Sequence, residues 1–354
     1  MFARFSLVLM VNHACNLRCT YCYTGAKFRR AMSRRIAETA IGRAIRSVSQ
    51  GGTLELSFFG GEPLVEAELI DELIGVAESR ASAAGLELRI TMTTNGTIDT
   101  PAAWRVMLRP ELELNVSHDG LPAVHDRHRV GPDGAGSSDR VFATIERLLA
   151  AGREPRVVMV VRPDTAEFLP DGIAWLRGHG VRHVTPSLDL WARWTRDDAW
   201  RLQSVIVRCA ELWRAGLPEC SISWFDDKAA MLTGVPSNET ARCGFGHGEI
   251  AVAPSGNLFP CERLIGEDAS GNSARLPGHA LDGDDFCQLQ PAGCRSADPC
   301  AECSIASLCR ATCRCSNFIR TGDVRRPDGL LCMFESTCYR ETARMLGQLH
   351  VLSA

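Results

Sequence analysis

Three cysteines near the start of the chain, Cys15, Cys19 and Cys22, lie four and three residues apart. Thiolates at this spacing converge on one point when a tight loop carries them. Zinc normally takes four ligands, whereas three thiolates satisfy three irons of a [4Fe–4S] cube and leave the fourth iron open for chemistry. The alternative is three unpaired loop cysteines. We expect an iron–sulfur centre with an open iron here.

Glycine-rich and polar motifs follow the next three predicted strands. They are Gly60-Gly61-Glu62-Pro63, Thr94-Asn95-Gly96 and Ser117-His118-Asp119-Gly120. Glycines allow close approach to the backbone, and the Glu62 carboxylate can accept a hydrogen bond from an ammonium group. Alone, Asn-Gly and Asp-Gly pairs are typical of turns. These motifs also stand at the carboxyl ends of successive strands, which form the functional rim of a barrel. That position makes a binding role about as favoured as a simple turn.

Short β-rich runs alternate with helical patterns and must position these motifs. The expected strands are 6–11, 53–58, 87–93, 112–117, 156–161 and 183–188. The expected helices are 33–49, 66–84, 101–108, 139–151, 165–178 and 196–215. Repeated β–α units predict a parallel sheet with right-handed crossovers. Six units are too few for an eight-stranded barrel, so we expect an α/β fold with a partial (β/α)₆ TIM-like barrel.

Beyond about residue 216 the composition and patterning of the sequence change. Helical periodicity fades, and Gly, Pro, Asp and Cys dominate from Cys243 to Cys338. A segment with so few apolar residues needs metal to fold. We expect a barrel over 1–216, a linker over 217–240 and a cysteine-rich domain over 241–354. Within the last part we expect a hairpin over 250–261, a surface loop over 269–293 and a terminal helix over 336–346.

Length and charge exclude several classes. The chain has 354 residues and a formal net charge of −3, which favours neither nucleic acid nor an anionic membrane. No apolar run reaches the length of a bilayer span. The apolar start leads into Cys15 without a small-residue cleavage site, so we expect a buried strand, not a signal peptide. We therefore expect a cytoplasmic protein, in which sixteen cysteines indicate metal binding before disulfides.

The Cys15–Cys22 spacing, with the aromatic Tyr21 before the last cysteine, resembles the radical S-adenosylmethionine (SAM) superfamily. In that family the open iron chelates the amino and carboxylate groups of SAM, and an electron from the cluster breaks the S–C5′ bond. The 5′-deoxyadenosyl radical then abstracts a substrate hydrogen. The resemblance implies a [4Fe–4S] cluster, SAM and an external one-electron reductant of the flavodoxin or ferredoxin type.

The strand-end motifs lie where that family binds SAM. The stretch of Gly60, Gly61, Glu62 and Pro63 corresponds to the GGEP-type motif, which meets the SAM amino group. Asn95 and Ser117 stand where the family places ribose- and carboxylate-binding groups. The resemblance therefore makes Asn95 and Ser117 candidate SAM ligands.

A charged stretch follows the fourth predicted strand and carries His125, Asp126, Arg127 and Arg129. It resembles the His-Asp-x-x-Arg stretch of peptide-modifying members of the family. Arg127, Arg129 and Arg140 are candidates to reach SAM. A solvated charged turn is the competing interpretation of each arginine.

Seven C-terminal cysteines match the pattern of the SPASM domain, the auxiliary-cluster module of radical SAM maturases. They are Cys243, Cys261, Cys300, Cys303, Cys309, Cys313 and Cys332. A zinc ribbon is the main competitor, since a CxxC pair alone would suit zinc. By resemblance, one auxiliary [4Fe–4S] cluster takes Cys300, Cys303, Cys309 and Cys332. A second auxiliary [4Fe–4S] cluster takes Cys243, Cys261 and Cys313.

The second auxiliary set lacks a fourth cysteine. Sulfatase-maturing relatives supply one a few residues before the position of Cys243, but residues 235–242 contain none. The alternatives are Cys220, Cys294, Cys315, a non-cysteine ligand or an open iron that meets substrate. Cys209, on an expected helix, is most simply a small buried hydrophobic residue.

Glu262 directly follows Cys261, where sulfatase maturases carry a catalytic aspartate. A net oxidation must remove an electron and a proton after hydrogen abstraction, and a nearby carboxylate suits the proton. The resemblance makes Glu262 a candidate catalytic base. A salt bridge with Arg263 or another neighbour is the alternative.

Tryptophans gather late in the barrel sequence. Trp191, Trp194 and Trp200 follow the sixth predicted strand, where they could line a peptide site. Packing of the last barrel helix against the auxiliary module is the competing interpretation.

The residues support three functional hypotheses. The first is a radical SAM/SPASM maturase that oxidatively modifies a ribosomally made peptide, giving a cyclophane, a thioether or another crosslink. The second is an anaerobic sulfatase maturase that converts Cys or Ser to formylglycine, against which Glu262 and the missing ligand count. The third is a non-catalytic iron–sulfur electron carrier, against which the intact Cys15–Cys22 triplet and Glu62 count.

The expected partners follow from the first hypothesis. They are a precursor peptide or protein substrate and the external reductant, with no nucleic acid and no membrane. Because the first predicted strand comes so early, we expect no fused winged-helix recognition domain. A leader peptide would then bind the barrel itself or a separate recognition protein.

Overall fold

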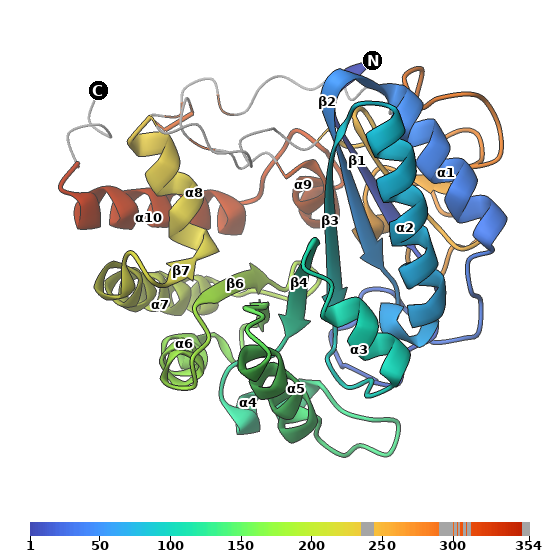
Figure 1. Cartoon of the computed structure of the whole chain (residues 1–354). Coiled ribbons are helices and arrows are strands. Elements are labelled where there is room, and N and C mark those ends of the chain that lie inside the picture. Colours follow the sequence, from blue (N-terminus) through green and yellow to red (C-terminus); the bar gives the residue numbers. More distant parts are fainter. Residues whose placement is uncertain are drawn as a thin grey trace. The chain divides into compact units, whose positions relative to one another are not determined.

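The computed structural model describes residues 1–234, 244–289, 300, 303, 305–306, 309 and 313–348. The chain divides into two compact units, each assembled from separate stretches (Figure 1). The first comprises Met1–Ser117, Arg129–Pro155 and Gly244–Gly293. The second comprises His118–His128, Arg156–Cys243 and Cys294–Ala354.

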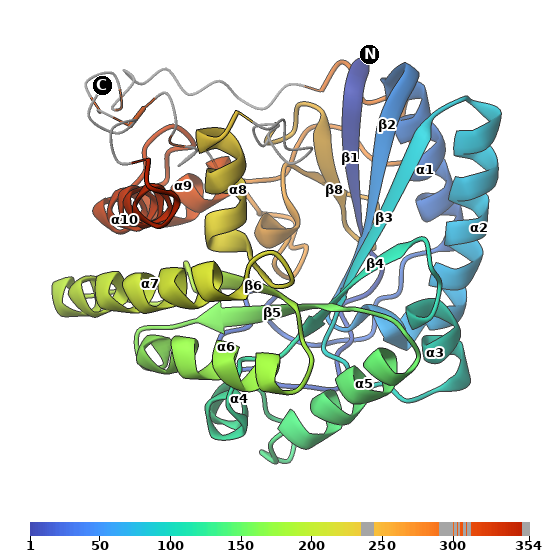
Figure 2. The same ribbon diagram turned by 60° about the vertical axis from the view of Figure 1, so that its left-hand side comes forward.

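The described part of the first unit contains six strands. They are β1 (Phe2–Met10), β2 (Val48–Phe59), β3 (Glu87–Thr94), β4 (Leu112–Ser117), β8 (Glu249–Val252) and β9 (Leu258–Phe259). Their order is β4-β3-β2-β1-β8-β9, and only β9 runs antiparallel to its neighbour. Figure 2 shows β1, β2 and β3 side by side, with β8 next to β1.

Helices cover this sheet. They are α1 (Arg34–Ser47), α2 (Ala67–Ala83), α3 (Pro101–Met107) and α5 (Ser138–Ala150), with 3-10 turns η1 (Pro63–Glu66) and η3 (Glu262–Leu264). Alternate residues of β1, namely Phe5, Leu7 and Leu9, are fully buried, as expected for a strand with period-two patterning. Buried positions of α1 recur every three or four residues and form the facing stripe. Ser33 caps α1 by accepting a hydrogen bond from the Ile36 backbone N–H.

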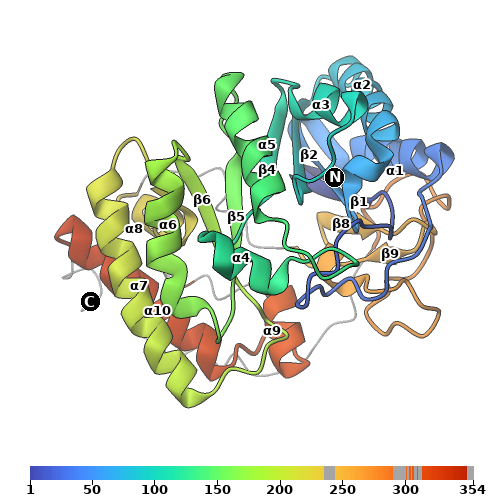
Figure 3. The same ribbon diagram turned by 90° about the horizontal axis from the view of Figure 1, so that it is seen from below.

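The second unit has a parallel sheet in the order β7-β6-β5. Its strands are β5 (Arg156–Val161), β6 (His183–Leu188) and β7 (Ser221–Ile222). Its helices are α4 (Pro122–His128), α6 (Leu169–Gly178), α7 (Arg196–Gly216), α8 (Ser223–Leu232), α9 (Arg314–Thr321) and α10 (Gly329–Leu346), and η2 (Ala166–Phe168) precedes α6. In Figure 3, α6, α7 and α10 are neighbouring helices of this unit, and α10 packs against both α7 and α8.

All six predicted strands are present, and the predicted partial (β/α)₆ class with a cysteine-rich C-terminal region is confirmed. The predicted hairpin is also present, because β8 and β9 are antiparallel around a turn at Gly256. The last helix begins at Gly329, not at residue 336, because the Asp328 side chain accepts a hydrogen bond from the Leu331 N–H and caps it earlier. The division at residues 217–240 into separate domains stays a prediction.

Three short helices, α4, α8 and α9, were not expected from the sequence. Each is ten residues or shorter, so its apolar period is hard to separate from loop sequence. Within the described ranges, no helix is long and apolar enough to cross a membrane.

Candidate active site

The three N-terminal cysteines lie on the loop that leaves β1 in the first unit, and each is partly exposed. The Cys22 N–H donates to the Cys19 carbonyl at 3.1 Å, which makes the loop tight, and the Arg18 N–H donates to the Val130 carbonyl at 2.7 Å. Among the described residues, no three Cys, His, Asp or Glu side chains are grouped as a single metal ion requires. A [4Fe–4S] cube instead offers a separate iron to each thiolate.

The Cys15 and Cys22 thiols have opposite surroundings. Burial raises the pKa of Cys15 to about 11, although the Leu17 backbone N–H, 3.4 Å from its Sγ, acts the other way. Burial also disfavours the Cys22 thiolate, but the Lys27 ammonium, 2.9 Å from Sγ, and the Thr24 hydroxyl outweigh it and lower the Cys22 pKa. Ligation of iron needs thiolates. Lys27 therefore favours the form of Cys22 that binds metal.

The Gly60–Pro63 turn lies against the chain that leads into the cysteine loop. The Gly61 N–H donates to the Asn12 carbonyl at 3.1 Å, and the Glu62 N–H donates to the Ala14 carbonyl at 2.8 Å. A Cβ at Gly61 would lie 2.3 Å from the Ala14 carbonyl oxygen. Only glycine permits this approach.

The Glu62 side chain is fully buried, and both of its carboxylate oxygens accept hydrogen bonds. Its Oε1 accepts from the Leu64 N–H at 3.0 Å and from the Thr94 hydroxyl at 2.7 Å, and its Oε2 accepts from the Asn95 N–H at 2.7 Å. Burial raises the pKa of Glu62 to about 7, against the effect of these donors. Glu62 thus ties the turn after β2 to the end of β3, and its expected contact with an ammonium group stays a prediction.

Asn95 lies beside the cysteine loop. Its Nδ2 is 2.9 Å from Asn16 Oδ1 and 3.7 Å from Cys15 Sγ. Ser117 ends β4 and is buried, so the ends of β1, β2, β3 and β4 carry the predicted residues as expected for a parallel sheet.

The structure separates the three candidate arginines. The Arg129 guanidinium is buried and lies over the ring of Tyr21, 5.3 Å from its centroid, so it contacts the cysteine loop. Arg127 belongs to the second unit, where it donates to the Asp164 carbonyl at 3.0 Å. Arg140 is exposed on α5. Of the three, Arg129 is the one that the structure brings to the cysteines.

In the first unit, Cys261 is buried and Glu262 is partly exposed at the start of η3. The Cys261 thiol donates to Glu262 Oε2 at 3.2 Å. The carboxylate is therefore in contact with a predicted cluster ligand.

Four predicted ligands of one auxiliary cluster line a single cavity of the second unit. The cavity has a volume of about 640 Å³, and its lining includes Cys300, Cys303, Cys309 and Cys332. Burial raises the pKa of the Cys332 thiol, and the neighbouring Cys300 and Cys303 raise it further. Thiols that lie this close resist ionisation, because their thiolates would repel one another. A bound group that supplies positive charge, such as an iron cluster, would offset this repulsion.

The second predicted auxiliary set is described only in part. Cys243 and Cys294 lie outside the described residues. Cys313 and Cys315 have their sulfur atoms 3.2 Å apart, and Cys220 is partly exposed at the end of the chain segment that follows α7. Cys209 is fully buried on α7, as the sequence predicted.

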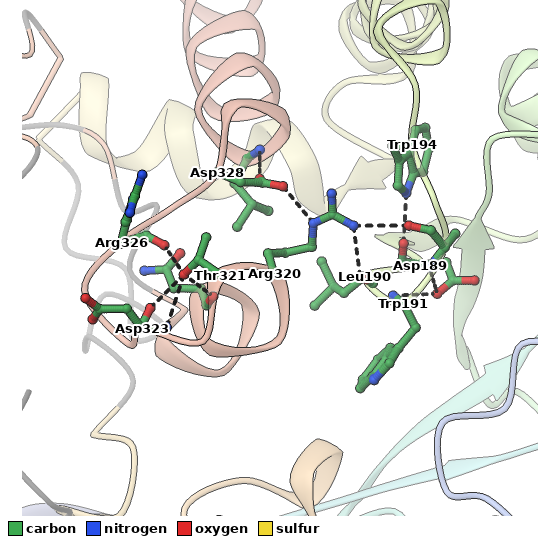
Figure 4. Close-up of polar contacts among 12 residues, drawn as sticks. Asp189, Leu190, Trp191, Trp194, Arg320, Thr321, Asp323, Arg326 and Asp328 are labelled. Carbon is green, nitrogen blue, oxygen red and sulfur yellow. Dashed lines mark hydrogen bonds and ion pairs between the residues drawn. The ribbon is translucent and has the colours of Figure 1, made fainter.

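The loop after β6 is held by a polar network within the second unit (Figure 4). Arg320 of α9 donates to the carbonyls of Leu190 and Ala192, both at 3.1 Å, and to the Asp328 carboxylate at 2.7 Å. The Asp189 carboxylate accepts from the Trp191 N–H at 3.0 Å. Trp191 is held in place at its backbone, and the residue as a whole is 46% exposed.

Three further tryptophans of residues 191–224 divide between two roles. Trp224 is buried and meets the Phe334 ring of α10 edge-on at 5.0 Å, and Trp213 is buried on α7. Trp200 is 65% exposed at the start of α7. Packing therefore explains Trp213 and Trp224, but not Trp191 and Trp200.

Sequence reasoning missed Asn16, Lys27 and Thr97, which surround the cysteine loop. Lys27 carried a signal, because it is one of two lysines in a chain whose other basic residues are arginines. Asn16 and Thr97 are coupled by a 2.7 Å hydrogen bond across a long sequence separation, which no local pattern reveals.

The sequence matches the family model described as "Radical SAM superfamily" over residues 9–189. The chain belongs to the radical SAM superfamily. Membership implies a [4Fe–4S] cluster and SAM, and the thiols of the β1 loop, with N–H and ammonium donors aimed at their sulfur atoms, fit the cluster.

This radical SAM protein is 24% identical to the cysteine-type anaerobic sulfatase-maturating enzyme of Clostridium novyi over 73% of this chain and 74% of that one. Its fold is similar to native anSMEcpe with bound AdoMet and Kp18Cys peptide, with a TM-score of 0.78, 18% identity, and coverage of 98% and 99% of the two chains. It is also similar to Streptococcus suis SuiB bound to precursor peptide SuiA, with a TM-score of 0.63, 15% identity, and coverage of 93% and 76%. The predicted resemblance to radical SAM maturases is confirmed.

Proposed function

We propose that this radical SAM enzyme oxidatively modifies a residue of a ribosomally made peptide, through a carbon–carbon or thioether crosslink. The observation that carries the proposal is the cavity lined by Cys300, Cys303, Cys309 and Cys332. A cluster site additional to the one at Cys15, Cys19 and Cys22 suits a net oxidation, because the substrate must lose an electron after it loses a hydrogen atom. Likeness to SuiB, solved with a precursor peptide, supports a peptide substrate.

Each part of the chain has a distinct task in this proposal. Cys15, Cys19 and Cys22 hold the SAM-cleaving cluster, with Lys27 favouring the Cys22 thiolate. When bound, this cluster and SAM supply a 5′-deoxyadenosyl radical that abstracts a substrate hydrogen. Glu262 takes up the substrate proton at a carboxylate oxygen, for which its partial exposure suits it.

The remaining predicted residues complete the cofactor sites. The Gly60–Pro63 turn, Ser117 and Arg129 bind SAM, and Tyr21 supports Arg129 through its ring. A second auxiliary cluster takes Cys243, Cys261 and Cys313, and its fourth position is filled by Cys220, Cys294, Cys315 or a non-cysteine ligand, or is an open iron that meets substrate. A flavodoxin- or ferredoxin-type protein supplies the electron, and the enzyme works in the cytoplasm.

Peptide recognition is proposed to use Trp191. The loop that carries it follows the carboxyl end of β6, the functional edge of β/α folds, and Arg320 and Asp189 fix its backbone. A rigid, half-exposed indole offers a large contact area at a small entropy cost.

The test is mass spectrometry of a candidate peptide encoded beside the gene. The reconstituted enzyme is incubated with the peptide, SAM and dithionite, and a variant with Cys15, Cys19 and Cys22 changed to Ala is the control. We expect a product lighter by two hydrogens with a new intrapeptide linkage, and none with the control. Unchanged peptide in the presence of abundant 5′-deoxyadenosine would contradict the proposal.

The second candidate function is sulfatase maturation, favoured by the similarity to the Clostridium novyi enzyme. It predicts an aldehyde at a single Cys or Ser of a sulfatase peptide, with no linkage between residues. The third candidate, a non-catalytic carrier, predicts that the reduced, reconstituted wild-type protein forms no 5′-deoxyadenosine from SAM. The same mass spectra and nucleoside assay separate all three.

A further inference from the structure

Asn95, which the sequence assigns to SAM, has a side chain that is already used inside the first unit. Its Oδ1 accepts from the Thr97 backbone N–H at 2.9 Å and from the Thr97 hydroxyl at 2.6 Å. Its Nδ2 donates to Asn16 Oδ1 at 2.9 Å and lies 3.7 Å from Cys15 Sγ. The side chain thus connects the end of β3 to the cysteine loop.

The direction of each hydrogen bond in this network is fixed by chemistry. A backbone N–H can only donate, so the amide oxygen of Asn95 must face Thr97 and its nitrogen must face Cys15. Because Asn16 Oδ1 accepts from Asn95, the Asn16 amide nitrogen donates to the Thr97 hydroxyl at 2.7 Å, and that hydroxyl donates to Asn95. One N–H of Asn95 is thereby left for the sulfur of Cys15.

We infer that Asn95 is a positioning residue that sets the reduction potential of the cluster at Cys15, Cys19 and Cys22. An N–H aimed at a ligand sulfur withdraws electron density and favours the reduced cluster, which carries more negative charge. The Leu17 N–H, 3.4 Å from the same sulfur, acts in the same direction. Asn95 acts through Cys15. This inference depends on family membership and not on the identity of the peptide.

The burial of Asn95 strengthens the effect. The residue is 8% exposed, so little water competes for the amide or screens its dipole. Glu62 Oε2 also accepts from the Asn95 backbone N–H at 2.7 Å, which fixes the residue at both its backbone and its side chain. The donor to Cys15 is therefore preorganised before a cluster is assembled.

The test is an electron paramagnetic resonance redox titration of the reconstituted enzyme without SAM. The relevant signal is the one that disappears when Cys15, Cys19 and Cys22 are changed to Ala. Asn95→Ser keeps an oxygen that can accept from the Thr97 N–H but removes the donor to Cys15. We expect the equilibrium constant for reduction to fall about threefold to tenfold, where tenfold corresponds to about 59 mV for a one-electron couple.

Thr97→Val is the matched control. It removes the hydroxyl but keeps the backbone N–H that orients the Asn95 amide, so the potential should stay at the wild-type value. Asn95→Asp is a second variant that preserves the turn at Thr97 and places an oxygen toward Cys15, so it should lower the potential at least as far as Asn95→Ser.

SAM affinity distinguishes the inference from the assignment based on the sequence. If Asn95 acts on the cluster, Asn95→Ser shifts the SAM-free potential and changes the Kd of SAM by less than about twofold. A wild-type potential in both Asn95 variants, together with weakened SAM binding, would make Asn95 a SAM ligand and overturn the inference.

Discussion

At the scale of single residues, Glu62 is the most constrained group of the site. A carboxyl group that ionises near pH 4.5 in the unfolded chain ionises near pH 7 in the folded one, because burial opposes the charge. Between these values the folded state holds the additional proton, so stability falls as pH rises. The pKa shift therefore adds about 3 kcal/mol to the free energy of unfolding at low pH, compared with the free energy of unfolding above pH 7.

We therefore expect Glu62→Gln to flatten the pH dependence of unfolding. The wild-type metal-free chain should lose more stability between pH 5 and pH 8 than the variant does, by up to about 3 kcal/mol in urea titrations. The variant should also be less stable overall, since an amide cannot accept from all three donors around position 62. Glu68→Gln, at an exposed position of α2, should keep the wild-type slope, and equal slopes in all three proteins would contradict the assignment.

At the scale of elements, the turn after β2 depends on the absence of a side chain at Gly61. Gly61→Ala would place a Cβ 2.3 Å from the Ala14 carbonyl oxygen, and backbone atoms would have to move. We expect a loss of about 1–3 kcal/mol in stability and about 100-fold in 5′-deoxyadenosine formation, since small displacements of a site are costly. Gly75→Ala on α2, where a Cβ meets nothing within 4 Å, should stabilise by about 0.5–1 kcal/mol and keep activity.

Arg320 is a second element-scale contact, because one guanidinium joins α9 to the loop after β6 and to the cap of α10. Arg320→Ala should cost about 1.5–3 kcal/mol and accelerate hydrogen exchange at residues 190–194. Arg326 is exposed, and its backbone carbonyl accepts a hydrogen bond from the Thr321 hydroxyl. Arg326→Ala keeps this carbonyl and should therefore leave hydrogen exchange at residues 190–194 unchanged. Equal exchange in both variants would show that the loop is held by other contacts.

The elements were predictable because their signals are local. The strands β4, β5 and β6 are each six residues long and are followed by polar residues, and their bounds agree with those expected. The cysteine triplet is equally local. By contrast, the contacts of Asn95 and Arg320 join residues 79–80 and 128–130 positions apart, so sequence spacing gave no indication of them. The hydrogen bonds that Glu62 accepts from Thr94 and Asn95 likewise join residues 32 and 33 positions apart.

At the scale of the whole molecule, the proposed function makes the iron content of the chain depend on the C-terminal cysteines. Changing both Cys300 and Cys332 to Ala should remove about four irons and four sulfides per chain, one cluster, while leaving 5′-deoxyadenosine formation measurable. Peptide modification should fall sharply, since the substrate radical would lose one of its two proposed electron acceptors. Cys209→Ala, at a buried position of α7, is the matched control for losing a thiol. Unchanged iron content in the double variant would contradict the cavity assignment.

The pairing of β8 with β1 has a consequence for how the protein is made. Ser6 pairs with Glu249 and Leu9 with Val252, so one side of β1 stays unsatisfied until residues near 250 have left the ribosome. Unpaired strand edges recruit other chains, and pairing across such a sequence separation is slow. Synthesis from the N-terminus therefore leaves the strand that precedes the cysteine triplet among the last to be completed. Chains that end before β8 will expose the unpaired, aggregation-prone edge of β1 beside the cysteine loop.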